Sequence, residues 1–213
     1  MRLLHQVRPR EQLLAQGRYL GGTDSAEEWV WNEFPDRGQL LRVDAGQSLR
    51  ELYFAEGGAL TRVDWLSMPS TAAGADRLRC TVSYFQDSVH LGQQRARSER
   101  EYREWDLAEG CLRVPPARAA LGRFVKQISA VGGSAAAFSL AEDASGLRGE
   151  IHRWRVEETA TQQWRLSRLS KEGGRMRTWL LILDEWDIPQ RIEELGRGCA
   201  WQLRHAVVRQ GRR

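Results

Sequence analysis

The chain has 213 residues, of which 41% are hydrophobic, and this suffices for the core of one large all-β domain. The same fraction excludes a globally disordered chain, and no segment reaches the roughly 20 consecutive apolar residues of a membrane span. The 32 basic and 28 acidic residues leave a net charge of only +4. Because both signs are mixed along the same segments, the charge pattern argues against a nucleic-acid partner.

The N-terminal residues lack the apolar run of a signal peptide, so we expect a cytoplasmic protein. Residues 1–16 permit a short helix, with Pro9 at its start or interrupting it. The three cysteines, Cys80, Cys111 and Cys199, are odd in number and far apart. Their spacing indicates neither a disulfide framework nor a zinc site, and reduced thiols fit a cytosolic location.

Most of the remaining chain alternates large apolar residues with charged ones, in short runs separated by turn residues such as Glu56-Gly57-Gly58. This pattern predicts consecutive β-hairpins. The expected strands are 27–34, 39–45, 48–55, 59–67, 77–86, 88–95, 98–107, 147–157, 160–170, 175–185, 189–195 and 199–209.

Hairpins joined by short turns form an antiparallel meander that curls to cover one face. We therefore predict a mainly β fold. It is a strongly curved antiparallel meander sheet, either a half-barrel or a calycin-like (lipocalin-like) barrel, with one or two short helices. No linker, low-complexity tract or internal repeat divides the chain, so residues 1–213 are expected to form a single domain.

The clearest helix is predicted over 116–129, after a pair of prolines and before Gly132-Gly133. Its apolar residues share one face because they follow the i, i+3, i+4, i+7 spacing of a helix. They are Leu121, Phe124, Val125 and Ile128. Such a helix either covers the mouth of the curved sheet as a lid or fills its core.

Tryptophan is the most distinctive residue type of the predicted strands. Alternation at a period of two sends side chains to opposite faces, so the tryptophans should form one aromatic face. Two histidines share this spacing with their neighbouring tryptophans. The resulting ligand-lining candidates are Trp29, Trp31, Trp154, Trp164, Trp179, Trp201, His152 and His205. The alternative is that the tryptophans fill a closed core and the histidines are hydrogen-bonded beside it.

Signatures of catalysis are missing from the sequence. Carboxylate pairs such as Glu157-Glu158 are sequential neighbours and would point to opposite faces of a strand. The glycine pairs Gly21-Gly22 and Gly132-Gly133 lack the frame of a phosphate-binding loop. The sequence therefore predicts no catalytic residue, no metal ligand and no cofactor, and does not favour an enzyme.

Two hairpins carry a resemblance to a known family. The stretch Arg177–Glu193 has an apolar strand ending in Asp, a turn with Pro189 and an Arg-Ile-Glu return strand. Together with residues 21–43, it resembles the half-barrel carriers of the bacterial lipoprotein-localisation system over about a quarter of the chain. The resemblance implies a curved sheet around a helix or a lipidic ligand and no catalytic residues. The chain departs from that family in lacking a signal peptide and a lipobox cysteine.

These observations favour non-enzymatic binding of a hydrophobic or amphipathic, lipid-like small molecule in the concavity of the sheet. A second hypothesis is a protein-interaction or structural module with a solid aromatic core that forms a homodimer. Single-stranded nucleic-acid binding by arginines interleaved with aromatic residues is a third, less favoured hypothesis.

Overall fold

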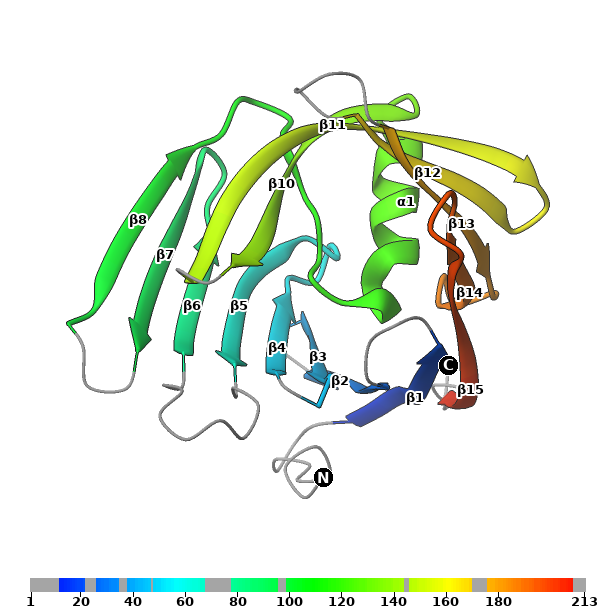
Figure 1. The fold of residues 1–213 in the computed structure, drawn as a ribbon, viewed down its shortest axis with the longest axis horizontal. Helices are drawn as coiled ribbons and strands as arrows, with labels where there is room; N and C mark the ends of the chain where they lie inside the picture. The colour runs from blue at the N-terminus through cyan, green and yellow to red at the C-terminus, as the bar shows by residue number, and fades with distance from the viewer. Residues whose placement is uncertain are drawn as a thin grey trace.

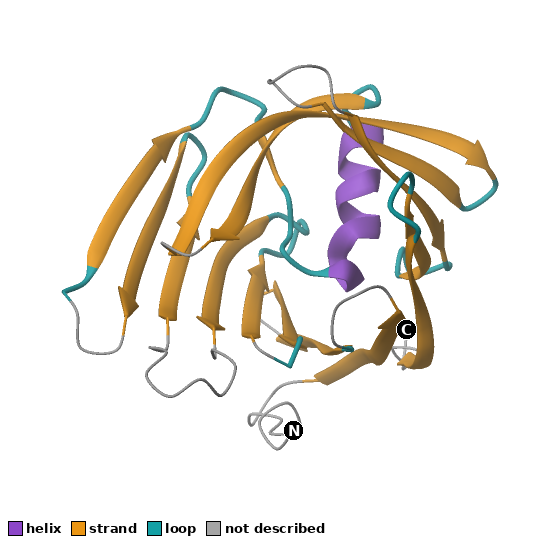
Figure 2. Ribbon diagram, in the orientation of Figure 1, coloured by secondary structure: helices purple, strands orange, loops and turns teal. Residues whose placement is uncertain are grey.

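The computed structural model describes residues 12–21, 26–34, 38–46, 48–67, 78–95, 99–143, 146–169 and 176–208. These residues form one large sheet and a single α-helix (Figures 1 and 2). The strands before the helix are β1 (Gln12–Gly21), β2 (Glu27–Phe34), β3 (Gly38–Asp44), β4 (Ser48–Phe54), β5 (Leu60–Ser67), β6 (Leu78–Tyr84), β7 (Ser88–Arg95), β8 (Glu101–Asp106) and β9 (Leu112–Arg113). A 3-10 turn, η1 (Arg118–Ala120), leads into α1 (Leu121–Ala130). The strands after it are β10 (Ser134–Asp143), β11 (Gly146–Ala160), β12 (Gln163–Leu169), β13 (Met176–Leu183), β14 (Pro189–Glu194) and β15 (Cys199–Val208).

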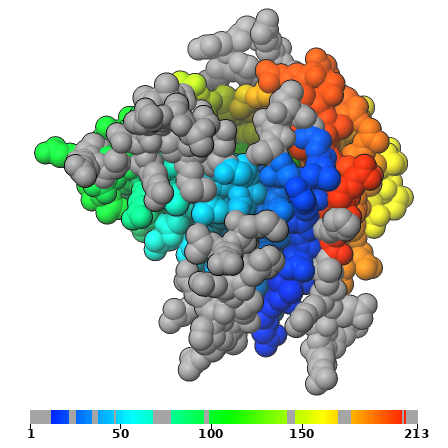
Figure 3. All heavy atoms as spheres, turned by 60° about the horizontal axis from the view of Figure 1, so that its bottom comes forward, coloured from blue at the N-terminus to red at the C-terminus, as the bar shows by residue number. Residues whose placement is uncertain are grey.

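The sheet is a meander in which the first strand, β1, and the last strand, β15, pair with each other near its centre. The strand order is β8-β7-β6-β5-β4-β3-β2-β1-β15-β14-β13-β12-β11-β10-β9, antiparallel except for the short parallel pair β9–β10. Figure 3 shows β1 in blue and β15 in red side by side. The sheet is not closed, because β8 and β9 are its two edges. The predicted fold class, a strongly curved antiparallel meander with a short helix, is confirmed in its open form.

Every strand expected from the sequence has a counterpart, and the helix expected at 116–129 corresponds to η1 and α1. The helix expected within residues 1–16 is wrong for residues 12–16, which belong to β1, and residues 1–11 lie outside the described residues. In β1, pairing with both β2 and β15 supplies the backbone hydrogen bonds and overrides local helix propensity.

Strand β10 was not expected because it does not alternate. Ala137, Phe138 and Ser139 are buried in succession, and a strand covered on both faces shows no period of two. One face of the β10–β11 hairpin packs on β6–β8, where the ring of Phe138 lies 6.2 Å from Tyr84 and 5.4 Å from Trp105. Its other face packs on the helix. The sheet therefore curls back on itself. The β10–β11 hairpin lies between strands β6–β8 on one side and helix α1 on the other.

Helix α1 lies inside the roll, against the face of β11 that carries Trp154 (Figure 1). Phe124, Val125 and Ile128 are almost fully buried, while Leu121 is half-buried and packs on the same core. Gly132 and Gly133 follow the helix with positive φ angles of 95° and 80°, which glycine adopts without strain. Among the described residues, no helix combines the length and apolarity that a membrane span requires.

Gly122 allows the close approach of α1 to the β13–β14 turn. A Cβ atom at this position would clash with the backbone carbonyl of Asp187 and contact a methyl group of Leu183. We expect Gly122→Ala to lower the free energy of unfolding by about 1–3 kcal/mol, because overpacking outweighs the gain in helix propensity. Denaturant unfolding of the variant measures this directly. Ser129→Ala, at an exposed position of the same helix, is the control and should change stability little; a Gly122→Ala protein as stable as wild type would contradict the packing argument.

Candidate ligand-binding site

The tryptophans singled out by the sequence all belong to the core between the sheet and α1. Trp29, Trp31, Trp154, Trp164 and Trp201 are at most 9% exposed, and Trp179 packs against them. Trp154 stacks on Trp179 at 5.6 Å and meets Phe124 of α1 edge-on at 5.4 Å. Trp65 on β5, which the sequence analysis did not include, belongs to the same core.

Positive charges from the helix segment cover several of these rings. Arg118 lies 4.5 Å from the ring of Trp201, Arg123 lies 3.9 Å from Trp31, and Lys126 lies 4.6 Å from Trp164. These are cation–π distances, so each pair attracts electrostatically. The polar side of α1 thus faces aromatic rings of the sheet.

Arg123 is half-buried and has a polar partner as well as an aromatic one. Its Nη1 donates to Gln39 Oε1 at 2.5 Å, and the same oxygen accepts the indole N–H of Trp31 at 3.1 Å. Burial lowers the pKa of the Arg123 guanidinium to about 10, although Asp187 and Glu33 oppose this shift. The group therefore remains charged at neutral pH and is held by an amide oxygen and an aromatic ring.

Several other buried donors have no acceptor. The indole N–H groups of Trp29, Trp65, Trp154, Trp164 and Trp201 find no hydrogen-bond partner within the described part of the chain. A buried donor without a partner costs about 1–3 kcal/mol. The side-chain amide of Asn32 is likewise buried without a partner among the described residues.

His152 shares the inward face of β11 with Trp154, two residues away. Its Nε2 lies 2.9 Å from Glu150 Oε2, and its Nδ1 is buried without a partner among the described residues. The hydrogen bond from His152 is the main cause that lowers the pKa of Glu150. His205 pairs with Arg18 through the backbone, and its side chain lies outside the described residues.

A small apolar pocket of about 270 Å³ opens where the C-terminal half of α1 meets β9 and the start of β5. It is lined by Ala59, Leu60, Leu112, Arg113, Gln127, Ala130 and Val131. None of the tryptophans is among these residues. The volume is at the low end of the range for small-molecule sites, which implies a small ligand.

Arg113 is the charged residue in the lining of this pocket. Its Nη2 donates to the backbone carbonyl of Phe85, and its guanidinium lies 6.0 Å from the ring of Tyr84. Its Nε is buried without a hydrogen-bond partner, and no carboxylate of the described residues forms an ion pair with it. Arg113 is therefore a cation at an apolar pocket with no counter-charge among the described residues.

The sequence analysis did not single out Arg113, Arg123 or Trp65. Trp65 alternates with apolar residues in an expected strand and could have been included on that basis. Arg113 belongs to a two-residue strand, too short to give a periodic signal. The described residues include no group of His, Cys, Asp or Glu side chains that could hold a metal ion.

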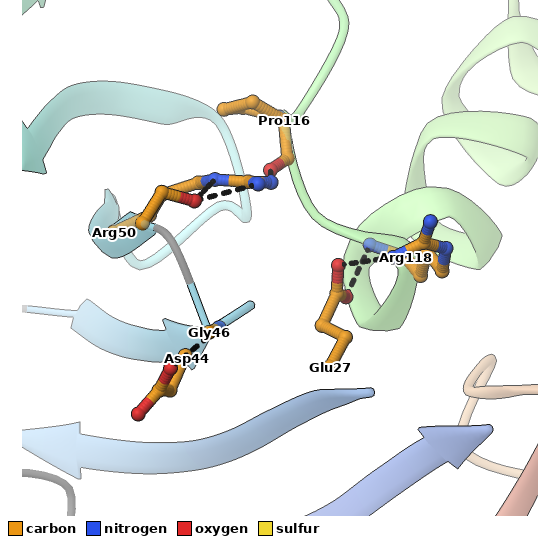
Figure 4. A network of polar contacts seen from close by, with 7 residues as sticks. Glu27, Asp44, Gly46, Arg50, Pro116 and Arg118 are labelled. Carbon is orange, nitrogen blue, oxygen red and sulfur yellow. Dashed lines mark hydrogen bonds and ion pairs between the residues drawn. The ribbon is translucent and has the colours of Figure 1, made fainter. Parts of the chain in front are cut away.

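The start of the helix is held to the sheet by a buried ion pair (Figure 4). Glu27 on β2 accepts hydrogen bonds from the backbone N–H of Arg118 at 2.9 Å and from its Nη1 at 2.8 Å. The Glu27 side chain is 1% exposed and that of Arg118 is 19% exposed. Nearby, Arg50 Nη1 donates to the carbonyl of Pro116 at 2.5 Å. Two strands thus fix the segment that enters α1.

Comparison with known proteins adds no identity to this geometry: no protein-family model, curated protein or solved structure matches the chain.

Replacing Glu27 tests how much the helix depends on this pair. Glu27→Gln keeps the shape but removes the buried carboxylate that Arg118 contacts, so we expect a loss of about 3 kcal/mol in the free energy of unfolding. Chemical denaturation followed by circular dichroism is the measurement. Glu157→Gln, which breaks an exposed pair with Arg165 at 3.2 Å, is the matched control and should have little effect. Equal effects of the two substitutions would show that the Glu27 pair has no special role.

Proposed function

We propose that this protein binds a small amphipathic molecule with an acidic group in the pocket between α1, β9 and β5. The observation that carries the proposal is Arg113, a cation in the lining of an apolar pocket with no carboxylate partner among the described residues. The proposal narrows the sequence hypothesis of a lipid-like ligand in the concavity of the sheet to one pocket and adds a negative charge to the ligand.

The lining favours a ligand with one apolar and one charged end. Leu60 and Leu112 provide apolar surface from the sheet, and Ala130 and Val131 provide it from the helix. Val131 is 56% exposed, so a bound aliphatic chain would remove apolar surface from water. Gln127 adds an amide, whose nitrogen donates to the carbonyl of Gly58 at 3.3 Å.

The helix determines the orientation of the ligand. Ala130 and Val131 are at the C-terminal end of α1, where backbone carbonyls carry partial negative charge. An anionic group is disfavoured at that end and favoured near Arg113. The acidic group would therefore lie at β9 and the apolar part against the helix end.

A matched pair of ligands tests the charge preference. Octanoate and octanol differ in the acidic group, and displacement of a bound anilinonaphthalene sulfonate probe reports the binding of either. We expect octanoate to bind more tightly, and Arg113→Gln to weaken octanoate at least tenfold while leaving octanol nearly unchanged, because a charge-assisted hydrogen bond is lost. Equal weakening of both ligands would contradict the role of Arg113.

A second pair of variants tests the place of binding. Ala130→Phe puts a large side chain into the pocket and should abolish displacement by either ligand. Ser129→Phe, one residue earlier and outside the lining, should bind as the wild type does. Unchanged octanoate binding in Ala130→Phe would exclude this pocket as the site.

A further inference from the structure

A second cationic site lies on the inward face of β11–β13, away from the Arg113 pocket. On β12, Trp164 and Leu166 face the core, and Arg168 follows at the same alternation. Arg168 is opposite Trp154 on β11 and opposite Arg177 on β13. A half-buried arginine thus lies between a tryptophan and a second arginine.

The carboxylates near Arg168 are already shared by other cations. Glu194 Oε1 lies 2.8 Å from Arg177 Nη2 and 3.4 Å from Arg197 Nε. Glu150 in turn contacts two side chains of its own strand. They are His152 at 2.9 Å and Arg148 at 3.1 Å.

Arg168 itself forms no ion pair or hydrogen bond through its side chain with any residue that the structure describes. Within the described residues, Arg168, Arg177 and Arg197 therefore share the one carboxylate of Glu194, which leaves two positive charges in excess. Burial, and then the proximity of Arg177, lowers the pKa of Arg168, so its environment disfavours the charge it carries. Two arginines directly opposite each other in a sheet repel and destabilise it unless an anion lies between them.

We propose that Arg168, with Arg177 beside it, binds the phosphate group of a small phosphomonoester. A phosphomonoester carries nearly two negative charges at neutral pH, which matches the two uncompensated positive charges better than a carboxylate does. Its terminal oxygens accept paired hydrogen bonds from planar guanidinium groups. Trp179, which is half-buried and stacks on Trp154, lies on the same face and offers apolar surface to the esterified part. This site shares no residue with the lining of the Arg113 pocket, so either proposal can fail without the other.

Isothermal titration calorimetry of the full chain with inorganic phosphate and with hexyl phosphate tests the site. We expect hexyl phosphate to bind, and Arg168→Gln to weaken it at least tenfold. Equal affinities for the two probes would show that the protein recognises the phosphate group alone. Tighter binding of hexyl phosphate than of inorganic phosphate would show that the apolar surface beside the arginines also contributes. Either result supports the site. The absence of measurable binding by both probes would overturn the proposal.

Arg165→Gln is the matched control, because Arg165 lies on the same strand, is exposed and pairs with Glu157. The Arg165→Gln variant should bind hexyl phosphate as the wild type does. An equal loss of affinity in both variants would show that binding depends only on the overall surface charge, and would overturn the site.

Stability provides a second readout. Arg168→Met removes an unpaired cation opposite Arg177, so it should be at least as stable as wild type without ligand, yet gain no thermal stabilisation from hexyl phosphate. Stabilisation of this variant equal to that of wild type would also overturn the proposal.

Discussion

The buried pair between Glu27 and Arg118 determines where the helix lies, and the rest of the interior depends on that placement. Ala117, the residue that precedes η1, provides no side-chain hydrogen bond to the start of the helix. Glu27 supplies the missing acceptor from a strand 91 residues away and neutralises the guanidinium at the same time. A capping residue within the helix segment would have stabilised the helix but not its position in the fold. Glu27 does both, because it belongs to β2 and therefore also fixes the start of the helix against that strand.

Once α1 is held there, its cations lie against the rings of the sheet. Arg123 and Lys126 project from the helix toward Trp31 and Trp164, and each cation is attracted by the ring that it contacts. The apolar stripe of the helix packs on β10 and β11. The apolar side of the helix and two of its cations thus each contact a surface of matching chemistry.

The strands could be predicted because their alternation reflects a sheet with one buried face. β10 could not, since its consecutive buried residues Ala137 and Phe138 face two different layers. Within the site, the inward direction of Trp154 and His152 follows from spacing alone. Arg168 follows the same spacing after Trp164 and Leu166, so a charge on the apolar face of β12 could have been noticed. The partner of Glu27 could not, because nothing local links β2 to residue 118.

The arginines of the interior differ in what balances their charge, and this difference is the basis of both proposed sites. Arg118 has a buried carboxylate, and Arg123 has an amide oxygen and an aromatic face. Arg113 and Arg168 have no ion-pair partner among the described residues, although each lies at an apolar surface. A cation taken from water without compensation destabilises the fold. In both proposals, the bound anion would supply the compensation that these two arginines lack within the described residues.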